Sequence, residues 1–587
     1  MIPFRDRRPV GPPGGPPVGP PVGRRAAWRE TERGAAAVLV ALATLPILIG
    51  SAVLGVDLAR LQLSGQQAQR AADSAALAGV VFLPADPSQA DGAARAAARA
   101  NGIPAANVDI TRVPGFPSRL SVRISVVVSH GFGQLLGVPS HTVSRLAIAD
   151  FARPLVLGSP CNVIGNEDMP GAGGGPGQSA VGGAACRGGG RLWTAIQGPD
   201  SNKEHGDAVT AARCVWGPAD NKPDGCTADG FGPKPPGRNL DFRPGGYTYV
   251  VRVTRPGVLR LQGYDLGWVA TGSTCQGVLN RAGTLVSALV GADRVLTNEY
   301  VDSAGGTVNA RYGQGAGPFC AGDSQGVYPY DDDSAAALSM STIVTPRRPG
   351  TSGWDPTTGD PLCPASTYPG YDGLRTTLAT RLRAATGGAA GLALRRTFHR
   401  WADICPGTAV TPGDYTVTVT TGAGAGQNRY AIRGWLEGQT GGVAVMAQER
   451  LGAYVNLASG SSRFHLVRLD SSAAGRTLEV GIFDLGDAAA PINLTLLGVD
   501  SDLPFGHCDV SGALSVAADP CSIVTSRSVS DSHWLRFRIP IPRGYRCPSD
   551  DDQSKCWVRA QIWSSREQYD ATTWTAKMDG DPVRLVR

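Results

Sequence analysis

Cysteine is absent from the first 160 residues of this 587-residue chain, and no Cys-x-x-Cys pair occurs anywhere in it. The closest two cysteines are Cys547 and Cys556, a spacing that excludes the usual structural zinc patterns. The even total of 12 cysteines indicates disulfide bonds formed in an oxidising compartment. We expect three local pairs, which are Cys214–Cys226, Cys508–Cys521 and Cys547–Cys556.

Charge is also sparse. Charged residues make up only 18% of the chain, the net charge is +6, and the arginines are scattered. Because no RNP, helix-turn-helix or zinc-finger pattern accompanies them, we predict no nucleic-acid partner. The chain instead contains 78 glycines and 44 prolines, a composition typical of short strands and loops. The expected fold class is therefore mostly β.

Catalytic motifs are missing as well. The seven histidines show no His-Glu-x-x-His or other ligand spacing. The segments 209–214 and 320–326 resemble, in the right order, the two signature segments of trypsin-like serine proteases. Arg213 stands at the place of the histidine base, and arginine keeps its proton near neutral pH, so Ser324 lacks a general base there. We predict no enzyme activity, no catalytic or metal-binding residue and no cofactor, and keep a tethered serine hydrolase using Ser324 as the last alternative.

One long apolar run is present. Gly34–Val56 carries no charged residue and is long enough for a helix that crosses a membrane once. The flank before it is rich in arginine, which by the positive-inside rule keeps residues 1–33, a Pro/Gly/Arg-rich tail, in the cytoplasm. We expect a single-pass protein of the cell membrane with most of the chain outside. An uncleaved anchor is preferred to a signal peptide, because the apolar region of a signal peptide is shorter.

The helical pattern continues beyond the run to about Val80, followed by an Ala/Arg-rich helix at 88–101 and a strand at 120–129. In this part, Glu32–Gly34, Asp57–Arg60 and Gln69–Gly79 resemble the N-terminal signature of TadE/TadG-like Flp pilus-assembly proteins. The resemblance extends over about residues 32–150. It implies a non-enzymatic component of a pilus or related cell-surface apparatus, with Tad machinery proteins as partners.

Two features depart from the patterns of related families. Prepilin-peptidase substrates generally carry glutamate five residues after the glycine, whereas Leu39 stands five residues after Gly34. TadG-type members often contain a von Willebrand A domain with a DxSxS metal motif, but Asp332–Ala336 and Asp470–Ala474 reach only DxSxA. The resemblance therefore implies an anchored protein without that metal site.

The remaining chain appears twice in related form. Residues 249–253 and 259–267 match residues 465–469 and 478–486, and both pairs end in Asp-Leu-Gly. Alternating apolar residues in these strands favour antiparallel β-sandwiches. We predict the domain boundaries 1–33 cytoplasmic tail, 34–56 transmembrane helix, 57–153 Tad-like helix plus small α/β region, 154–345 β-sandwich domain 1, 346–405 helical linker or insertion, and 406–587 β-sandwich domain 2.

Several residues leave other functions open. Trp557, Trp563 and Trp574 would form a stacking platform if exposed together, which is the basis of the alternative that the chain is a surface-displayed glycan- or matrix-binding module. Asp265 and Asp484 stand at the Asp-Leu-Gly ends of the repeated strand pairs and either close turns or bind calcium. The same choice applies to the acidic clusters 331–333 and 550–552. Oligomeric state and exterior partner are not determined by the sequence.

Overall fold

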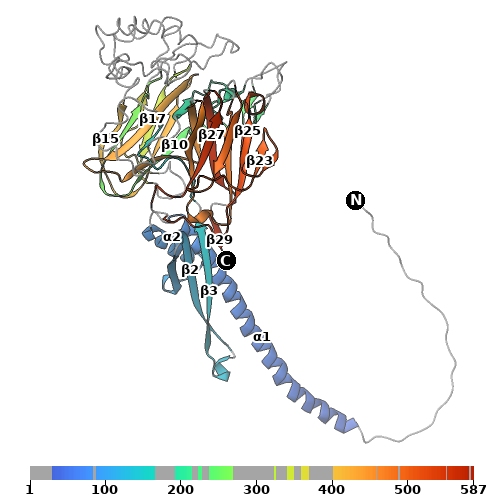
Figure 1. Cartoon of the computed structure of the whole chain (residues 1–587). Coiled ribbons are helices and arrows are strands. Elements are labelled where there is room, and N and C mark those ends of the chain that lie inside the picture. Colours follow the sequence, from blue (N-terminus) through green and yellow to red (C-terminus); the bar gives the residue numbers. More distant parts are fainter. Residues whose placement is uncertain are drawn as a thin grey trace, which may run out of the picture. The chain divides into compact units, whose positions relative to one another are not determined.

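Figure 1 shows the computed structural model of the chain. The structure describes residues 30–83, 87–114, 116–131, 133–151, 153–165, 192–214, 223–227, 237–268, 323–324, 340–349, 359–368, 401–457, 459–486, 490–549, 552–566, 568–580 and 583–586. These residues fall into two compact units: one runs to Ala68 and includes Ser125–Ser144, and the other contains Gln69–Ile124 and Arg145–Arg587. The fold is mostly β, with several antiparallel sheets, as the sequence predicted.

The first unit contains most of one long helix, α1 (Glu30–Val80). It also contains the end of β2 (Phe116–Ser129), the short helix η2 (Gly133–Leu136) and the start of β3 (Ser140–Phe151). Leucine and alanine, which favour helices, are frequent along α1. Within the part of the chain that the structure describes, no helix combines the length and the hydropathy required of a membrane span.

In the second unit, the end of α1 packs against α2 (Pro87–Ala100) through small residues. A side chain on Gly79 would lie 2.5 Å from Leu120 and 2.7 Å from the carbonyl oxygen of Ala90, so only glycine allows this approach. A small sheet follows in the order β1-β2-β3-β29, with β1 at Val108–Val113 and β29 at Val583–Val586. We call the C-terminal end of α1, together with α2 and this sheet, the base.

Two large antiparallel sheets make up most of the second unit. The 10-stranded sheet has the order β14-β13-β16-β10-β18-β4-β20-β27-β22-β25. Its strands are β4 (Val156–Gly158), β10 (Tyr247–Val253), β13 (Thr342–Arg347), β14 (Ser366–Tyr368), β16 (Gly413–Thr421), β18 (Val443–Gln448), β20 (Gly460–Arg468), β22 (Ile492–Leu497), β25 (Ser522–Thr525) and β27 (Trp557–Ser564).

The 12-stranded sheet has the order β15-β11-β17-β6-β19-β28-β21-β26-β23-β24, with β5 and β12 pairing β17. Its strands are β5 (Val163–Ile164), β6 (Leu192–Gln197), β11 (Gly257–Tyr264), β12 (Asp323–Ser324), β15 (Trp401–Val410), β17 (Gln427–Leu436), β19 (Arg450–Leu457), β21 (Thr477–Phe483), β23 (Cys508–Gly512), β24 (Val516–Ala518), β26 (Trp534–Pro540) and β28 (Gln568–Met578). One core cluster joins buried residues of both sheets, among them Val251 of β10 and Leu261 of β11. A three-stranded sheet, β7-β9-β8, is formed by Arg213–Cys214, Gly237–Asn239 and Cys226–Thr227.

The sheets contain an internal repeat. The order β14-β13-β16-β10 reappears as β25-β22-β27-β20, and β15-β11-β17-β6 reappears as β26-β21-β28-β19. We call 156–436 the first repeat and 443–578 the second repeat. At the centre, β6 pairs with β19, with Thr194 opposite Ala453. The first strand of each repeat, here called its opening strand, pairs with the other repeat. β18, which opens the second repeat, pairs with β10 of the first, and β4, which opens the first repeat, pairs with β20 of the second.

This topology differs from the predicted domain boundaries. The strands β16 and β17, within residues 406–587 assigned by sequence to β-sandwich domain 2, pair with strands of the first repeat, β16 with β10 and β17 with β11. Val583–Val586 pairs with β3 of the base rather than with a sandwich strand. The expected helical linker 346–405 contains β14 and the start of β15, while residues 369–400 lie outside the described residues. Local patterns reveal strands and turns but not which strands pair, and β10 and β11, although consecutive, lie in different sheets.

Candidate functional site

The most distinctive surface of the first unit is the exposed apolar surface around α1. Large apolar side chains along this helix are 51–70% exposed: Val38, Leu39, Val40, Leu42, Leu45, Ile47, Leu48, Leu54, Val56, Leu58 and Leu63. Each buried CH₂ group stabilises a folded protein by about 0.8 kcal/mol, so leaving this many in water is unfavourable. A contiguous apolar surface of this kind indicates contact with lipid or with another protein.

Asp57 fixes the β2–β3 hairpin to α1. It is the first charged residue after the apolar run, yet its side chain is only 6% exposed. Its Oδ1 accepts a hydrogen bond from the Gly131 amide at 2.9 Å, and its Oδ2 accepts one from the Gly133 amide at 3.2 Å. Hydrogen bonds to an ionised carboxylate are about twice as strong as neutral ones. The hairpin tip, including η2, is thereby held at the point of α1 where the apolar run ends.

A buried lysine connects the two repeats. Lys203 is fully buried, and its Nζ donates to the Asp224 carbonyl oxygen and, at 2.8 Å, to Asp241 Oδ2. The same Asp241 oxygen accepts from the Trp534 indole at 2.9 Å, and Arg536 pairs with the Asp224 carboxylate at 3.1 Å. Burial lowers the pKa of Lys203, whereas Asp241 raises it. The loop of the first repeat is thus tied to β26 of the second.

A second buried network surrounds Asp207. Its oxygens accept hydrogen bonds from the Tyr247 hydroxyl at 2.8 Å and from the amides of Gln197 at 2.9 Å and Thr210 at 2.8 Å. Burial raises the pKa of Tyr247 well above its usual value, as does the Asp207 charge. Tyr247 therefore stays protonated and serves as a donor. This arrangement stabilises the region between the sheets rather than activating a nucleophile.

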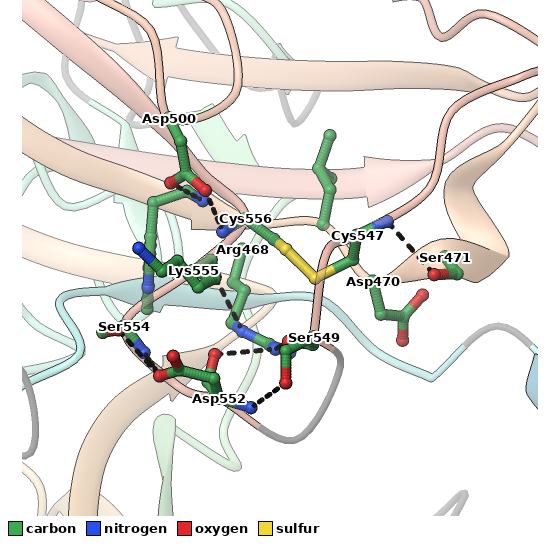
Figure 2. The surroundings of a disulfide bond; sticks show 12 residues. Arg468, Asp470, Ser471, Asp500, Cys547, Ser549, Asp552, Ser554, Lys555 and Cys556 are labelled. Atoms are coloured by element: carbon green, nitrogen blue, oxygen red, sulfur yellow. Dashed lines mark hydrogen bonds between the residues drawn. A yellow bond between two sulfur atoms is a disulfide. The ribbon is translucent and has the colours of Figure 1, made fainter. Parts of the chain in front are cut away.

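Figure 2 shows the disulfide Cys547–Cys556 and the loop that it closes. Arg468 reaches into this loop and donates to backbone carbonyl oxygens, including that of Lys555 at 3.1 Å. Asp500 accepts from the amide of Cys556 at 2.7 Å. These contacts satisfy backbone groups in a loop that lacks its own regular structure.

All three local disulfides predicted from the spacing are present, and Cys363–Cys405 forms a fourth. Cys161 is also disulfide-bonded. Among the cysteines that the structure describes, none is free. The predicted disulfide framework is therefore present in both repeats.

The acidic positions singled out in the sequence lie in turns. Asp265 and Asp484 end β11 and β21 with the same φ of 56°, and their side chains are 0% and 1% exposed. Asp484 accepts a hydrogen bond from the Ser532 amide. Asp552 accepts from Ser554, while 331–333 and 550–551 lie outside the described residues. Among the described residues, no group of three or more possible metal ligands occurs.

The three C-terminal tryptophans differ in exposure. Trp557 and Trp574 are each 1% exposed, whereas Trp563 is 49% exposed. The expected three-tryptophan platform is therefore not formed. His465 stacks edge-on against Trp557, and burial lowers its pKa to about 4. His465 is thus a neutral packing residue near physiological pH.

The described residues of the two protease-like segments belong to short strands. Arg213 pairs with Arg238 between β7 and β9, and Ser324 pairs with Gln427 between β12 and β17. The two segments join different sheets. The sequence placed Asp57 in the family signature but did not reveal its contact with Gly131, nor the contacts of Lys203 and Asp207, which depend on residues such as Asp241 and Tyr247 farther along the chain. The one sequence signal for any of these sites was that Asp57 directly follows the uncharged run Gly34–Val56.

Comparison with known proteins agrees with the expected resemblance. Residues 34–81 match the family model described as "Putative Flp pilus-assembly TadE/G-like". No curated protein and no solved structure matches the chain significantly. The match covers α1 from the beginning of its apolar run to its packed end, including Asp57. The chain thus carries a TadE/G-like segment at residues 34–81, as the N-terminal signature indicated.

Proposed function

We propose that this protein is a membrane-anchored, non-enzymatic component of Flp/Tad-type pilus assembly or of a related cell-surface apparatus. The observation that carries the proposal is the coincidence of the TadE/G-like match at 34–81 with the exposed apolar surface around α1. The described β-sheets, stabilised by disulfides, lie outside the membrane and make protein contacts there.

Membrane anchoring is supported by three features of the N-terminal part. The run Gly34–Val56 is uncharged, its large side chains are exposed along α1, and the preceding flank is rich in arginine. The disulfides add a fourth argument, because they require an oxidising compartment for the rest of the chain. In this orientation, residues 1–33 are cytoplasmic and the repeats are extracytoplasmic.

A non-enzymatic role is supported by how the polar groups of the interior are used. Lys203 and Asp207 make structural hydrogen bonds, and Tyr247 is held protonated. At the protease-like segment, Arg213 replaces the required base. Ser324 is tested directly with a fluorophosphonate probe, and covalent labelling of that serine would contradict the proposal.

Orientation is tested by cysteine labelling in intact cells. We expect Leu240→Cys, at a position 54% exposed in the first repeat, to react with a membrane-impermeant maleimide. The matched variant Val18→Cys, in the tail, is expected to react only after permeabilisation. Labelling of both in intact cells would refute the proposed topology.

The pilus role is tested by co-purification. Full-length protein extracted from cross-linked membranes of its host is expected to bring with it a Tad secretion ATPase, platform protein or pilin-like protein. Deletion of the gene should impair surface assembly, and the wild-type gene should restore it. Normal assembly in the deletion strain, with none of these proteins recovered, would contradict the pilus role while leaving anchoring intact.

A further inference from the structure

The outer face of the second repeat carries an exposed tryptophan in an ordered polar setting. Ile562 and Leu494 are buried in the core between the sheets, so residues that alternate with them face away from it. Trp563 is one of these and is 49% exposed. It lies opposite Ser461 on β20 and opposite Asn493 on β22. Asn493 in turn lies opposite Val524 on the edge strand β25.

These four residues, Ser461, Trp563, Asn493 and Val524, form one row across the strands. A second row lies beside it, two residues along each strand. It contains, in strand order β20, β27, β22 and β25, Arg463, Gln561, Thr495 and Ser522. Neighbouring strands are about 4.8 Å apart, so the two rows form a surface four strands wide. The side chains around Trp563 are mostly amides and hydroxyls.

The two amides beside Trp563 have fixed orientations. Asn493 Oδ1 accepts from the hydroxyls of Ser522 at 2.9 Å and Thr495 at 3.3 Å. Gln561 Oε1 accepts from Arg463 Nε at 2.7 Å. Because the oxygen of each amide is engaged, its NH₂ group points elsewhere, and within the described residues neither NH₂ group has a partner. The indole is therefore flanked by two preoriented donors.

The arginines near this surface share one aspartate. Arg463 and Arg559 both pair with Asp502, each at 2.8 Å, which leaves a net charge of only +1. Among the described residues of this surface, no row of unpaired arginines is available for a phosphate backbone or an acidic peptide. An uncharged ligand that offers an apolar ring face and many oxygen acceptors is complementary to this surface. A saccharide has this chemistry, since its C–H face stacks on indole and its hydroxyls accept from amides.

We propose that the face formed by Trp563, Asn493 and Gln561 binds a neutral glycan, with one sugar ring stacked on the indole. A proline-rich peptide is the competing ligand, but such peptides dock into grooves lined by several aromatic residues. Here a single tryptophan lies on the face of a sheet. This role is independent of the proposed pilus function and of the buried Trp557 and Trp574.

The first repeat supplies an internal comparison. Its corresponding strands β13 and β16 contain no tryptophan and carry threonines, such as Thr418, whose hydroxyl lies 3.4 Å from that of Thr248. The described strands β13 and β16 therefore do not reproduce the tryptophan-centred surface of the second repeat. Thr418→Ala provides a control substitution on an equivalent face.

The test measures binding to full-length protein in lipid nanodiscs by titration calorimetry. The probes are chitotetraose, cellotetraose, maltotetraose and a proline decapeptide. We expect at least one saccharide to bind. Trp563→Ala should weaken that binding at least tenfold, Asn493→Ala and Gln561→Ala severalfold each, and Thr418→Ala not measurably.

Circular dichroism and the unfolding midpoint show whether Trp563→Ala remains folded, which its exposure leads us to expect. Failure of all three saccharides to bind at millimolar concentration would overturn the proposal, as would full binding by a folded Trp563→Ala variant. Binding of the proline peptide alone would replace the glycan with a peptide ligand. None of these outcomes bears on the cysteine-labelling or co-purification tests.

Discussion

Asp414 is expected to make stability depend on pH in a defined way. It accepts two hydrogen bonds from one guanidinium, Arg252 Nε at 2.7 Å and Arg252 Nη2 at 2.9 Å, and a third from Arg153 at 3.2 Å. Arg252 belongs to β10, whereas Arg153 follows β3 of the base and also donates to the Leu83 carbonyl oxygen. One carboxylate thereby joins the base to the 10-stranded sheet.

Burial raises the pKa of Asp414, but the charges of Arg252 and Arg153 outweigh it and lower the pKa from 3.8 to about 2. One pKa unit corresponds to about 1.4 kcal/mol, so the ionised form stabilises the fold by about 2 kcal/mol. Because the folded-state pKa lies below the unfolded one, this stabilisation is complete above about pH 4. It is lost as the pH falls through 2.

We therefore expect Asp414→Asn to lower the free energy of unfolding by at least about 2 kcal/mol at pH 6, since both arginines lose their counter-charge. The difference from wild type should shrink between pH 4 and pH 2. Denaturant unfolding of the full chain in detergent, followed by tryptophan fluorescence, measures it. Asp509→Asn, at a side chain 68% exposed, is the control and should change stability by less than about 0.5 kcal/mol.

Two results would refute this reasoning. The first is unfolding of Asp414→Asn at the wild-type midpoint at pH 6, which would mean that the carboxylate adds no net stability. The second is a stability deficit that stays constant from pH 6 to pH 2, which would mean that the loss comes from packing and not from charge.

Three further outcomes follow from other contacts. Replacing Cys547 and Cys556 together by serine should cost about 2.5 kcal/mol in denaturant unfolding, because the disulfide closes a short loop of separation 9; an unchanged midpoint would contradict this. His465 has a folded pKa of about 4, below 6.5, so wild type should lose stability as the pH falls from 6.5 to 4, and His465→Gln should remove that slope. Asp57→Ala should speed amide hydrogen exchange at Gly131 at least tenfold, and unchanged exchange would show that the carboxylate does not hold the hairpin.

Local patterns in the sequence predicted local structure. The helix that became α1, the strand at 120–129 and three disulfides all depend on neighbouring residues, and each is present. The repeated strand pairs before Asp265 and Asp484 were predicted for the same reason, and the two aspartates share a φ of 56°. The two strands of each pair do not form a hairpin, because β10 and β20 lie in the 10-stranded sheet and β11 and β21 lie in the 12-stranded sheet. Patterns of this kind carry information over a few turns of helix or a single hairpin.

Long-range contacts were not accessible in the same way. Asp57 was visible as a charge after an apolar run, but its partner Gly131 is 74 residues away. Nothing in the sequence around Lys203 indicates burial. In the structure its Nζ donates to Asp241, which also accepts from the Trp534 indole. Trp557 and Trp563 lie on the same face of β27, yet Trp557 is buried in a cluster with Val250 and Met446 whereas Trp563 is exposed. Alternation along a strand does not show which part of a face other residues cover.

The exchange of opening strands makes the two repeats interdependent. β18 pairs with β10, β4 pairs with β20, and β6 pairs with β19, so separating the repeats would expose unpaired edges in both sheets. The turn between β17 and β18 offers a place to cut, since a side chain on Gly438 would meet no atom within 4 Å. After a protease site is inserted there and cleaved, we expect the two fragments to elute together in size exclusion and to part on a reducing, denaturing gel. Fragments that separate without denaturant would show that each repeat folds alone, contrary to the observed pairing.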